Sequence, residues 1–182
     1  MLLDTPLCDF GWNAPEFSLA DPDGQQYTLS EQLGDKGLLI AFICNHCPYV
    51  QAIAERLKHD TDELIANGDK VLAIMSNDYQ NYSADSPENM KTFSAHYGFN
   101  FPYLVDETQE VGKAYNAVCT PEFFGFNKKG ELQYRGRLDD VRMNGSTEAR
   151  TRELFNAMMQ IAETGQGPRE QQPSMGCSIK WR

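Results

Sequence analysis

The chain has 182 residues, of which 41% are hydrophobic and 23% charged, a composition that suits one globular domain with a sizeable core. It carries 26 acidic against 16 basic residues, a net charge of −10, and no cluster of four or more Lys and Arg, which argues against a surface that tracks nucleic-acid phosphates. No stretch is apolar over the roughly 20 residues that a membrane helix needs, and five cysteines are too few for a disulfide scaffold in a chain of this length.

The first half of the chain predicts a buried strand that leads into a long helix. Residues 38–43 are apolar without alternation, which is typical of a strand buried on both faces of a sheet. From Pro48 to about Asn67 the apolar side chains recur every three or four positions, as on one face of a helix. The other elements expected here are strands over 16–20 and 25–29, a helical turn over 30–34 and a strand over 71–75.

The order of strand, long helix and strand predicts a right-handed crossover between two parallel strands. The elements expected further along are helices over 86–97 and 106–115, a strand over 103–105, a hairpin over 122–127 and 131–135, and an amphipathic helix over 147–164. Residues 165–182 are rich in Gly, Pro and Gln and show no period. We therefore expect an α/β fold, with a single domain over 1–164 and a C-terminal tail over 165–182.

Charged side chains follow the expected hairpin at four positions. The sequence predicts a solvated edge there, rather than an arginine that turns toward a reactive site. The four residues are Arg135, Arg137, Asp139 and Asp140.

Four residues, Cys44-Asn45-His46-Cys47, connect the buried strand with the long helix. Unpaired N–H groups and the positive end of the helix dipole stabilise a thiolate at such a junction, and the thiolate is the form that attacks disulfides and peroxides. We expect Cys44, nearer the helix tip, to be the exposed nucleophile, and Cys47, one turn deeper, to resolve the mixed disulfide. His46 should lower the pKa of Cys44 further.

A C-x-x-C motif also occurs in zinc sites, but such sites usually need a second pair of ligands. The histidines downstream of the motif, His59 and His96, are isolated. The sequence therefore predicts a redox pair without a metal or a cofactor. The N-terminal residues lack a basic region followed by a long apolar stretch, so we expect no signal peptide and a cytoplasmic location, where thiols stay reduced.

A second motif, Cys119-Thr120-Pro121, lies just before the expected hairpin. Bonds that precede proline are the ones that adopt the cis form, and a cis bond here would leave the preceding backbone free to pair with a bound substrate chain. We expect Thr120-Pro121 to be cis and to lie beside the redox pair. Cys119 is either an auxiliary thiol or a small buried hydrophobe. Cys177 either reaches back from the tail to the redox pair or belongs to a docked structural tail.

Together these motifs resemble one family over about residues 10–140. The segments that carry the resemblance are Gly11–Leu19, Asp23-Gly24, Leu29-Ser30, the C-x-x-C behind its strand and Thr120-Pro121. They resemble the redoxin branch of the thioredoxin-like superfamily, also called the alkyl hydroperoxide reductase and thiol-specific antioxidant family. The final Gly176–Trp181 is similar to the tail of a group of uncharacterised bacterial members, which suggests a bacterial source.

The resemblance implies a thioredoxin-like fold, in which helices flank a central mixed sheet that has an N-terminal β-hairpin extension. It also implies that Cys44 and Cys47 form the redox pair and that Pro121 is cis beside them. Two departures are visible. Peroxiredoxins of this branch carry P-x-x-x-T-x-x-C before the reactive cysteine. Counted back from Cys47, the Pro position is Ile40 and the Thr position is Cys44. The Thr is also absent when the count starts at Cys44. Thioredoxins carry a buried acid six residues before the first cysteine, where this chain has a leucine.

The primary hypothesis is a dithiol-disulfide oxidoreductase that acts on a protein or small-molecule disulfide, with a reductant that the sequence does not identify. Because Cys47-Pro48 resembles the Cys-Pro of peroxiredoxins, a thiol peroxidase with an antioxidant function is the alternative. A copper-delivery module is the second alternative, since its family carries a C-x-x-x-C-P motif that is one residue longer. No nucleic-acid or membrane partner is expected, and the sequence predicts no particular oligomeric state.

Overall fold

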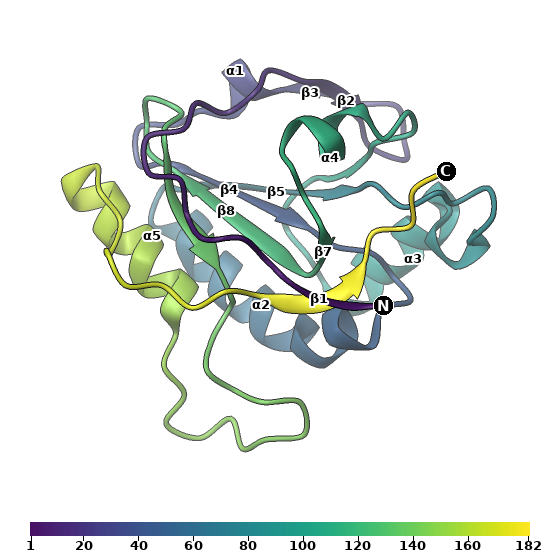
Figure 1. Ribbon diagram of the computed structural model, residues 1–182. Coiled ribbons are helices and arrows are strands. Elements are labelled where there is room, and N and C mark those ends of the chain that lie inside the picture. The colour runs from purple at the N-terminus through teal and green to yellow at the C-terminus, as the bar shows by residue number, and fades with distance from the viewer.

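A mixed sheet of seven strands runs through the centre of the protein, which the computed structural model describes over residues 1–182 (Figure 1). In spatial order the strands are β3 (Gln26–Thr28), β2 (Ser18–Ala20), β6 (Tyr103–Val105), β5 (Lys70–Met75), β4 (Leu38–Phe42), β8 (Glu122–Phe126) and β9 (Leu132–Gly136). β4, β5 and β6 are parallel, and all other neighbours are antiparallel. The mixed sheet is confirmed, and the N-terminal hairpin extends it because β2 pairs with β6.

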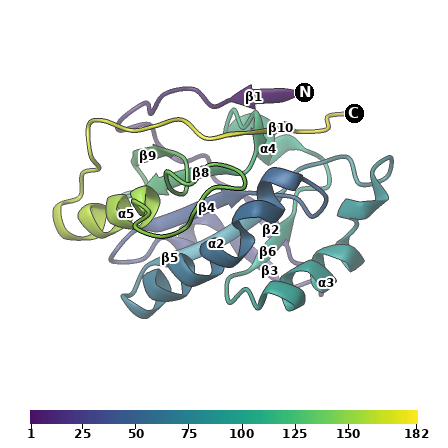
Figure 2. The same ribbon diagram turned by 90° about the horizontal axis from the view of Figure 1, so that it is seen from below.

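Helices cover both faces of the sheet because β4 and β5 are apolar on both sides. Leu39 and Ala41 belong to one core and Leu38, Ile40 and Phe42 to the other. The first core contains α2 (Pro48–Ala66), α3 (Pro87–Tyr97) and α5 (Glu153–Thr164), and the second contains α1 (Leu29–Gln32) and the region around α4 (Glu110–Ala114). Figure 2 shows the three helices of the first core along one face. None of the helices combines the length and apolarity needed to cross a bilayer.

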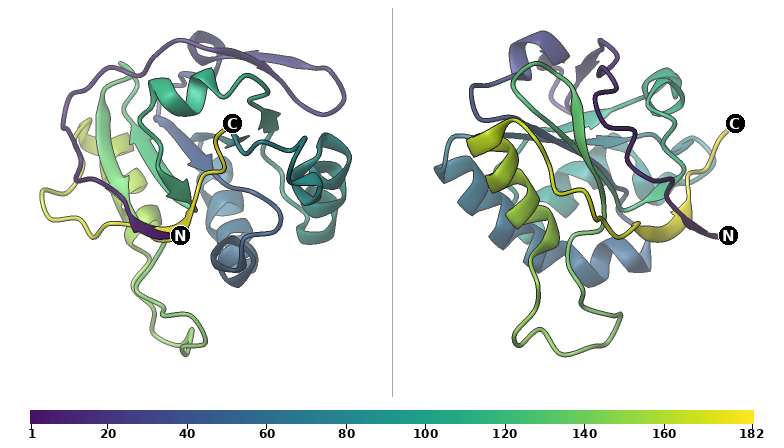
Figure 3. Two further views of the ribbon diagram at one scale, coloured as in Figure 1. Left: turned by 45° about the vertical axis from the view of Figure 1, so that its right-hand side comes forward. Right: turned by 60° about the vertical axis from the view of Figure 1, so that its left-hand side comes forward.

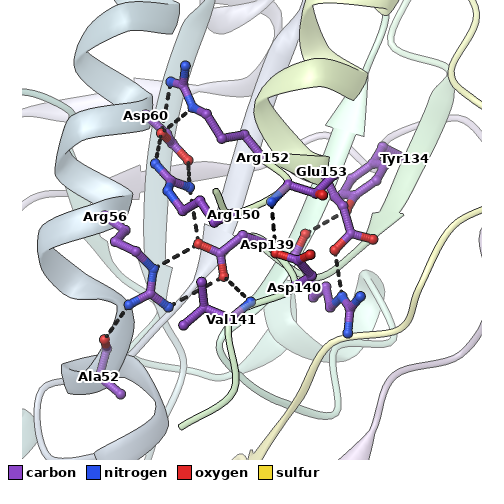
Figure 4. A network of polar contacts seen from close by, with 12 residues as sticks. Ala52, Arg56, Asp60, Tyr134, Asp139, Asp140, Val141, Arg150, Arg152 and Glu153 are labelled. Atoms are coloured by element: carbon purple, nitrogen blue, oxygen red, sulfur yellow. Dashed lines mark hydrogen bonds and ion pairs between the residues drawn. The ribbon is translucent and has the colours of Figure 1, made fainter. Parts of the chain in front are cut away.

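The last helix, α5, begins at Glu153 rather than near residue 147, so the prediction was wrong at this end. Ion pairs hold the preceding residues on α2 in an irregular conformation (Figure 4). Arg150 pairs with Asp60 of α2 at 2.6 Å and with Asp139 at 3.0 Å, and Arg152 pairs with Asp60 at 2.8 Å. Asp139 is thus buried in ion pairs, and the prediction of a solvated edge was wrong at this position.

A second, three-stranded sheet joins the two ends of the chain, and no pattern in the sequence predicted it. β1 (Leu2–Asp4) pairs with β10 (Met175–Ser178), which pairs in turn with β7 (Cys119–Thr120), all antiparallel. Figures 1 and 3 show the C-terminal segment, in yellow, beside the N-terminal strand. The segment over 165–182 is therefore docked on the rest of the protein and includes a strand.

Candidate active site

The C-x-x-C motif lies between the end of β4 and the start of α2, as the sequence predicted. Helix α2 begins at Pro48, so Cys47 is its N-cap residue, and Cys47 O accepts the backbone N–H groups of Val50 and Gln51. Cys44 is 1% exposed and Cys47 is fully buried. The prediction that Cys44 is the exposed sulfur at the helix tip was therefore wrong, because both cysteines are buried and Cys47 is the one at the helix tip.

Cys47 is the sulfur that its surroundings hold ionised. A hydrogen bond with Cys44, together with the backbone N–H of Val50 at the helix N-terminus, lowers the pKa of Cys47 to about 4. The same hydrogen bond, followed by burial and the negative charge of Asp85, raises the pKa of Cys44 above its ordinary value. The two sulfurs therefore interact strongly, and the direction of the Cys44 pKa shift is opposite to the lowering that the sequence predicted.

This assignment predicts the titration of the reduced protein. We expect the ultraviolet absorbance of the thiolate to rise with a midpoint near pH 4, far below the roughly 8.5 of a free cysteine. Cys47→Ser should remove this step. Cys119→Ser should leave it unchanged, because burial and then the charge of Glu122 raise the pKa of Cys119 to about 12. A step that persists in Cys47→Ser and disappears in Cys44→Ser would reverse the assignment.

Asp85 is a buried acid beside the motif that sequence reasoning missed. It ends the short 3₁₀ helix η1 (Ser83–Asp85) and is fully buried. Its carboxylate accepts the backbone N–H of Asn45 at 2.7 Å and lies 2.5 Å from Nδ1 of His46. One carboxylate thus fixes the loop between the two cysteines and orients the histidine. A buried acid is present after all, although it comes from a distant segment and not from β4.

The Thr120-Pro121 bond is cis and lies beside the redox pair, which confirms the prediction. Thr120 Oγ1 lies 3.4 Å from Cys44 Sγ, and the Thr120 carbonyl oxygen lies 3.4 Å from Cys47 Sγ. Since successive side chains of a strand point to opposite sides, Cys119 points away from this pair. Cys119 is fully buried, and we interpret it as a structural residue.

Cys177 is the third thiol at the site. In the β7–β10 pair it lies directly opposite Thr120, and cross-strand neighbours have their side chains on the same side. The Cys177 side chain packs against the core cluster that contains Cys44 and Cys47, and burial followed by interaction with Cys47 raises the pKa of Cys177. Cys177 is only half-buried, unlike Cys44 and Cys47. The remaining cysteine, Cys8, packs against the core on the other face of the sheet.

A groove of about 860 Å³ opens beside the cis-proline. Its walls come from the first half of α2, the loop over 137–145 and the tail over 173–175. Apolar and cationic side chains both line it, among them Tyr49, Met143 and Arg142. Asp139, near the start of this loop, forms ion pairs with Arg56 of α2 and with Arg150 (Figure 4). These ion pairs hold the start of the loop against α2.

Three donor atoms of different kinds, from Cys44, His46 and Asp85, lie within 4.8 Å of one another. Cys44 Sγ lies 3.4 Å from Thr120 Oγ1 and the carboxylate of Asp85 accepts the Asn45 N–H, whereas His46 Nδ1 lies 2.5 Å from that carboxylate but has no hydrogen-bond partner. The metal-binding or copper-delivery alternative stays a hypothesis, which metal analysis of protein purified without chelator tests.

Comparison with known proteins matches the same part of the chain. The model of the AhpC/TSA family matches residues 10–135. "Peroxiredoxin Bcp" of Escherichia coli (strain K12) is 31% identical over 112 residues, which cover 62% of this chain and 67% of that protein. "Thiol-disulfide oxidoreductase ResA" of Geobacillus kaustophilus is 28% identical over 131 residues, which cover 68% of this chain and 66% of that protein.

Solved structures extend the similarity to the whole chain. An uncharacterized conserved protein from Geobacillus kaustophilus is similar at a TM-score of 0.93 and 41% identity, over 100% of this chain and 97% of that one. A putative thiol:disulfide interchange protein DsbE from Chlorobium tepidum has a TM-score of 0.62 at 19% identity, over 85% of this chain and 98% of that one, and shows a shared thioredoxin-like fold. On the match over residues 10–135, the chain belongs to the AhpC/TSA family.

Proposed function

We propose that the protein is a thiol-disulfide oxidoreductase whose Cys44–Cys47 pair cycles between dithiol and disulfide. The observation that carries this proposal is the geometry of the two cysteines, which lie at the N-terminus of α2 with both sulfurs 3.4 Å from Thr120 beside the cis bond. Interaction with Cys44 lowers the pKa of Cys47. A nucleophile and a second thiol that displaces the product are thus in contact before a substrate arrives. The similarity to a thiol-disulfide oxidoreductase supports the same class of reaction. The test compares the rate at which three proteins reduce a disulfide substrate. They are the wild type, Cys47→Ser and the control Cys8→Ser.

Cys47 begins the proposed reaction. Its thiolate attacks one sulfur of a substrate disulfide, a bond forms between Cys47 and that sulfur, and the other substrate sulfur leaves as a thiolate. Cys44 then attacks Cys47 Sγ, the second substrate sulfur leaves, and the Cys44–Cys47 disulfide remains. The proton of Cys44 goes to one of the two product thiols. Two electrons have passed to the substrate, and an external thiol reductant restores the dithiol.

Asp85 acts in this proposal as a positioning residue. Its carboxylate holds the Asn45 N–H and so fixes the spacing of the two sulfurs. Its negative charge disfavours ionisation of Cys44, which keeps the proton on Cys44 and the thiolate on Cys47. His46 lies against the same carboxylate and, with Asp85, is within 4.8 Å of Cys44 Sγ, so a route for the departing proton is close.

The proposed substrate is a disulfide of a protein or a small molecule that enters the groove beside Pro121. The apolar side chains of this groove, beside charges of both signs, favour a substrate with an apolar part near its disulfide. The cytoplasm, where thiols stay reduced, remains our prediction for the location of the protein.

A thiol peroxidase is the second candidate, because Cys47 is an ionised sulfur directly before Pro48 and the chain is similar to a peroxiredoxin. We expect reduced protein to react with hydrogen peroxide within about an order of magnitude of free cysteine. The reason is that Cys47 is fully buried and that a thiol, Cys44, stands where peroxiredoxins carry a threonine hydroxyl. Stopped-flow measurement decides the matter, since a rate far above this range would make peroxide the substrate.

A further inference from the structure

The strand edge next to the cis-proline is already occupied by the protein's own tail. The backbone of β7, which a substrate chain would be expected to pair with, is paired with β10 instead, Cys177 opposite Thr120 and Ser178 opposite Cys119. Contacts on both sides of β10 hold it there. Ser174 Oγ donates to the Pro121 carbonyl at 2.6 Å, and the Ile179 N–H donates to the Val118 carbonyl at 3.1 Å.

Gly176 allows this close approach. A Cβ atom at position 176 would lie 1.8 Å from the Thr120 carbonyl oxygen and 2.5 Å from its carbon, distances that no side chain tolerates. Only glycine therefore lets β10 lie directly against the Thr120-Pro121 bond. This contact sets the next residue, Cys177, on the side of β7 that faces the redox pair.

Cys177 is also the most accessible of the three sulfurs. Cys44 is 1% exposed and Cys47 is fully buried, whereas Cys177 is half-buried and packs against the cluster that contains both. Exchange requires direct attack of a thiolate on a sulfur, so a buried disulfide reacts slowly with an external thiol. Cys177 offers an external thiol a more accessible sulfur than the buried pair does.

We infer that Cys177 is a third redox-active thiol, which moves the disulfide of the buried pair to the surface of the protein. This inference rests on the proposed function, which forms the Cys44–Cys47 disulfide. Cys177 then attacks Cys47 Sγ, the Cys47–Cys177 bond forms, the Cys44–Cys47 bond breaks, and Cys44 leaves as a thiolate. Cys44 takes up the proton that Cys177 has lost, and the number of disulfides does not change. An external thiol finally attacks the half-buried Cys177 Sγ.

The state of Cys47 itself controls this step. In the dithiol state the Cys47 thiolate holds a proton on Cys177 and raises its pKa. In the disulfide state Cys47 carries no charge, so it no longer raises the pKa of Cys177. Lys180, whose Nζ donates to the Ser178 carbonyl at 2.8 Å, is a cation close to the same strand and favours the Cys177 thiolate.

The test is a disulfide map of the full-length protein after oxidation with one equivalent of oxidised glutathione and an acid quench, read by mass spectrometry. We expect the wild type to contain a Cys47–Cys177 disulfide as well as the Cys44–Cys47 disulfide. Cys177→Ser should contain only Cys44–Cys47, and reduced glutathione should reduce it more slowly than the wild type by about tenfold or more. Cys8→Ser, which removes another half-buried thiol, should behave as the wild type does.

Gly176→Ala provides a second arm that keeps all the thiols. The added Cβ displaces β10 from Thr120, so the Cys47–Cys177 disulfide should be lost, whereas Gly34→Ala should have no effect because its Cβ meets only the flexible Lys70 side chain. A wild type that forms Cys44–Cys47 alone, together with unchanged reduction of Cys177→Ser, would overturn the inference and leave the proposed function intact. A wild type that forms neither disulfide and reduces no substrate would overturn both.

Discussion

Replacing Cys47 with serine is expected to lower the rate of disulfide reduction by about three orders of magnitude or more. The substitution removes the sulfur that the N-terminus of α2 and the hydrogen bond with Cys44 hold ionised near pH 4 and above. Neither Cys44 nor Cys177 replaces it, because burial, which raises the pKa of both thiols, remains in the variant. Turnover of a small disulfide substrate, with a thiol reductant in excess, measures the loss.

The matched variant is Cys44→Ser, which should fail at a different step. Its Cys47 thiolate still attacks the substrate disulfide, but no sulfur at position 44 displaces the product. With Cys177 also replaced by serine, we expect a stable mixed disulfide between Cys47 and the substrate, visible as a mass increase on non-reducing analysis. Trapping on Cys44 in Cys47→Ser, and none on Cys47 in the reciprocal variant, would instead restore the order of attack that the sequence predicted.

One residue of the sequence, Pro48, indicates which cysteine attacks first. Proline is favoured at the first position of a helix, so Pro48 indicates that α2 begins there and that the residue before it is the N-cap. This places Cys47, and not Cys44, at the positive end of the helix dipole. The contribution of Asp85 could not have been found in this way, because its burial depends on how η1 packs against the loop after β4.

The fold was predictable wherever an element carries a complete hydrophobic period. The residues of β4 and α2 show such periods, and both elements begin and end within one or two residues of the expected positions. β7 and β10 are two and four residues long, and their pairing joins segments more than fifty residues apart. Backbone hydrogen bonds between segments so far apart in the sequence leave no local pattern. The strand β10, which covers the redox pair, could therefore not be predicted.

The charged residues after the hairpin show the same limit. Arg135 was expected on a solvated edge, but its side chain is 8% exposed and pairs with the fully buried Glu122. The Glu122 carboxylate also accepts the backbone N–H of Val118 at 2.8 Å and that of Cys119 at 3.4 Å. The pair therefore fixes the strand that leads into Thr120-Pro121. A single sequence does not show that Arg135 and Glu122 form an ion pair, because their contact depends on how two strands pair.

Arg135→Met is expected to lower the free energy of unfolding by about 3–5 kcal/mol near neutral pH, since it leaves a buried carboxylate without its counter-ion. Arg137→Met is the matched control. Arg137 and its partner Glu153 are 39% and 20% exposed, and partly exposed pairs of this kind contribute about 1 kcal/mol or less. Urea unfolding of the two variants and the wild type measures both values.

The loss in Arg135→Met should also depend on pH in a defined direction. Burial already raises the pKa of Glu122 in the wild type, and Arg135 opposes this rise, so the variant raises the Glu122 pKa further. Consider a carboxyl group whose pKa is higher in the folded than in the unfolded state. It destabilises the fold increasingly as pH rises from its unfolded-state pKa to its folded-state pKa, and it has no such effect below the unfolded-state pKa. Unfolding free energies of the variant should therefore approach those of the wild type as pH falls from neutral toward the pKa of a glutamate in the unfolded chain. The double variant Glu122→Gln/Arg135→Met, which has no carboxyl group at position 122, should lack this dependence, and an equal pH dependence in both variants would show that another group is responsible.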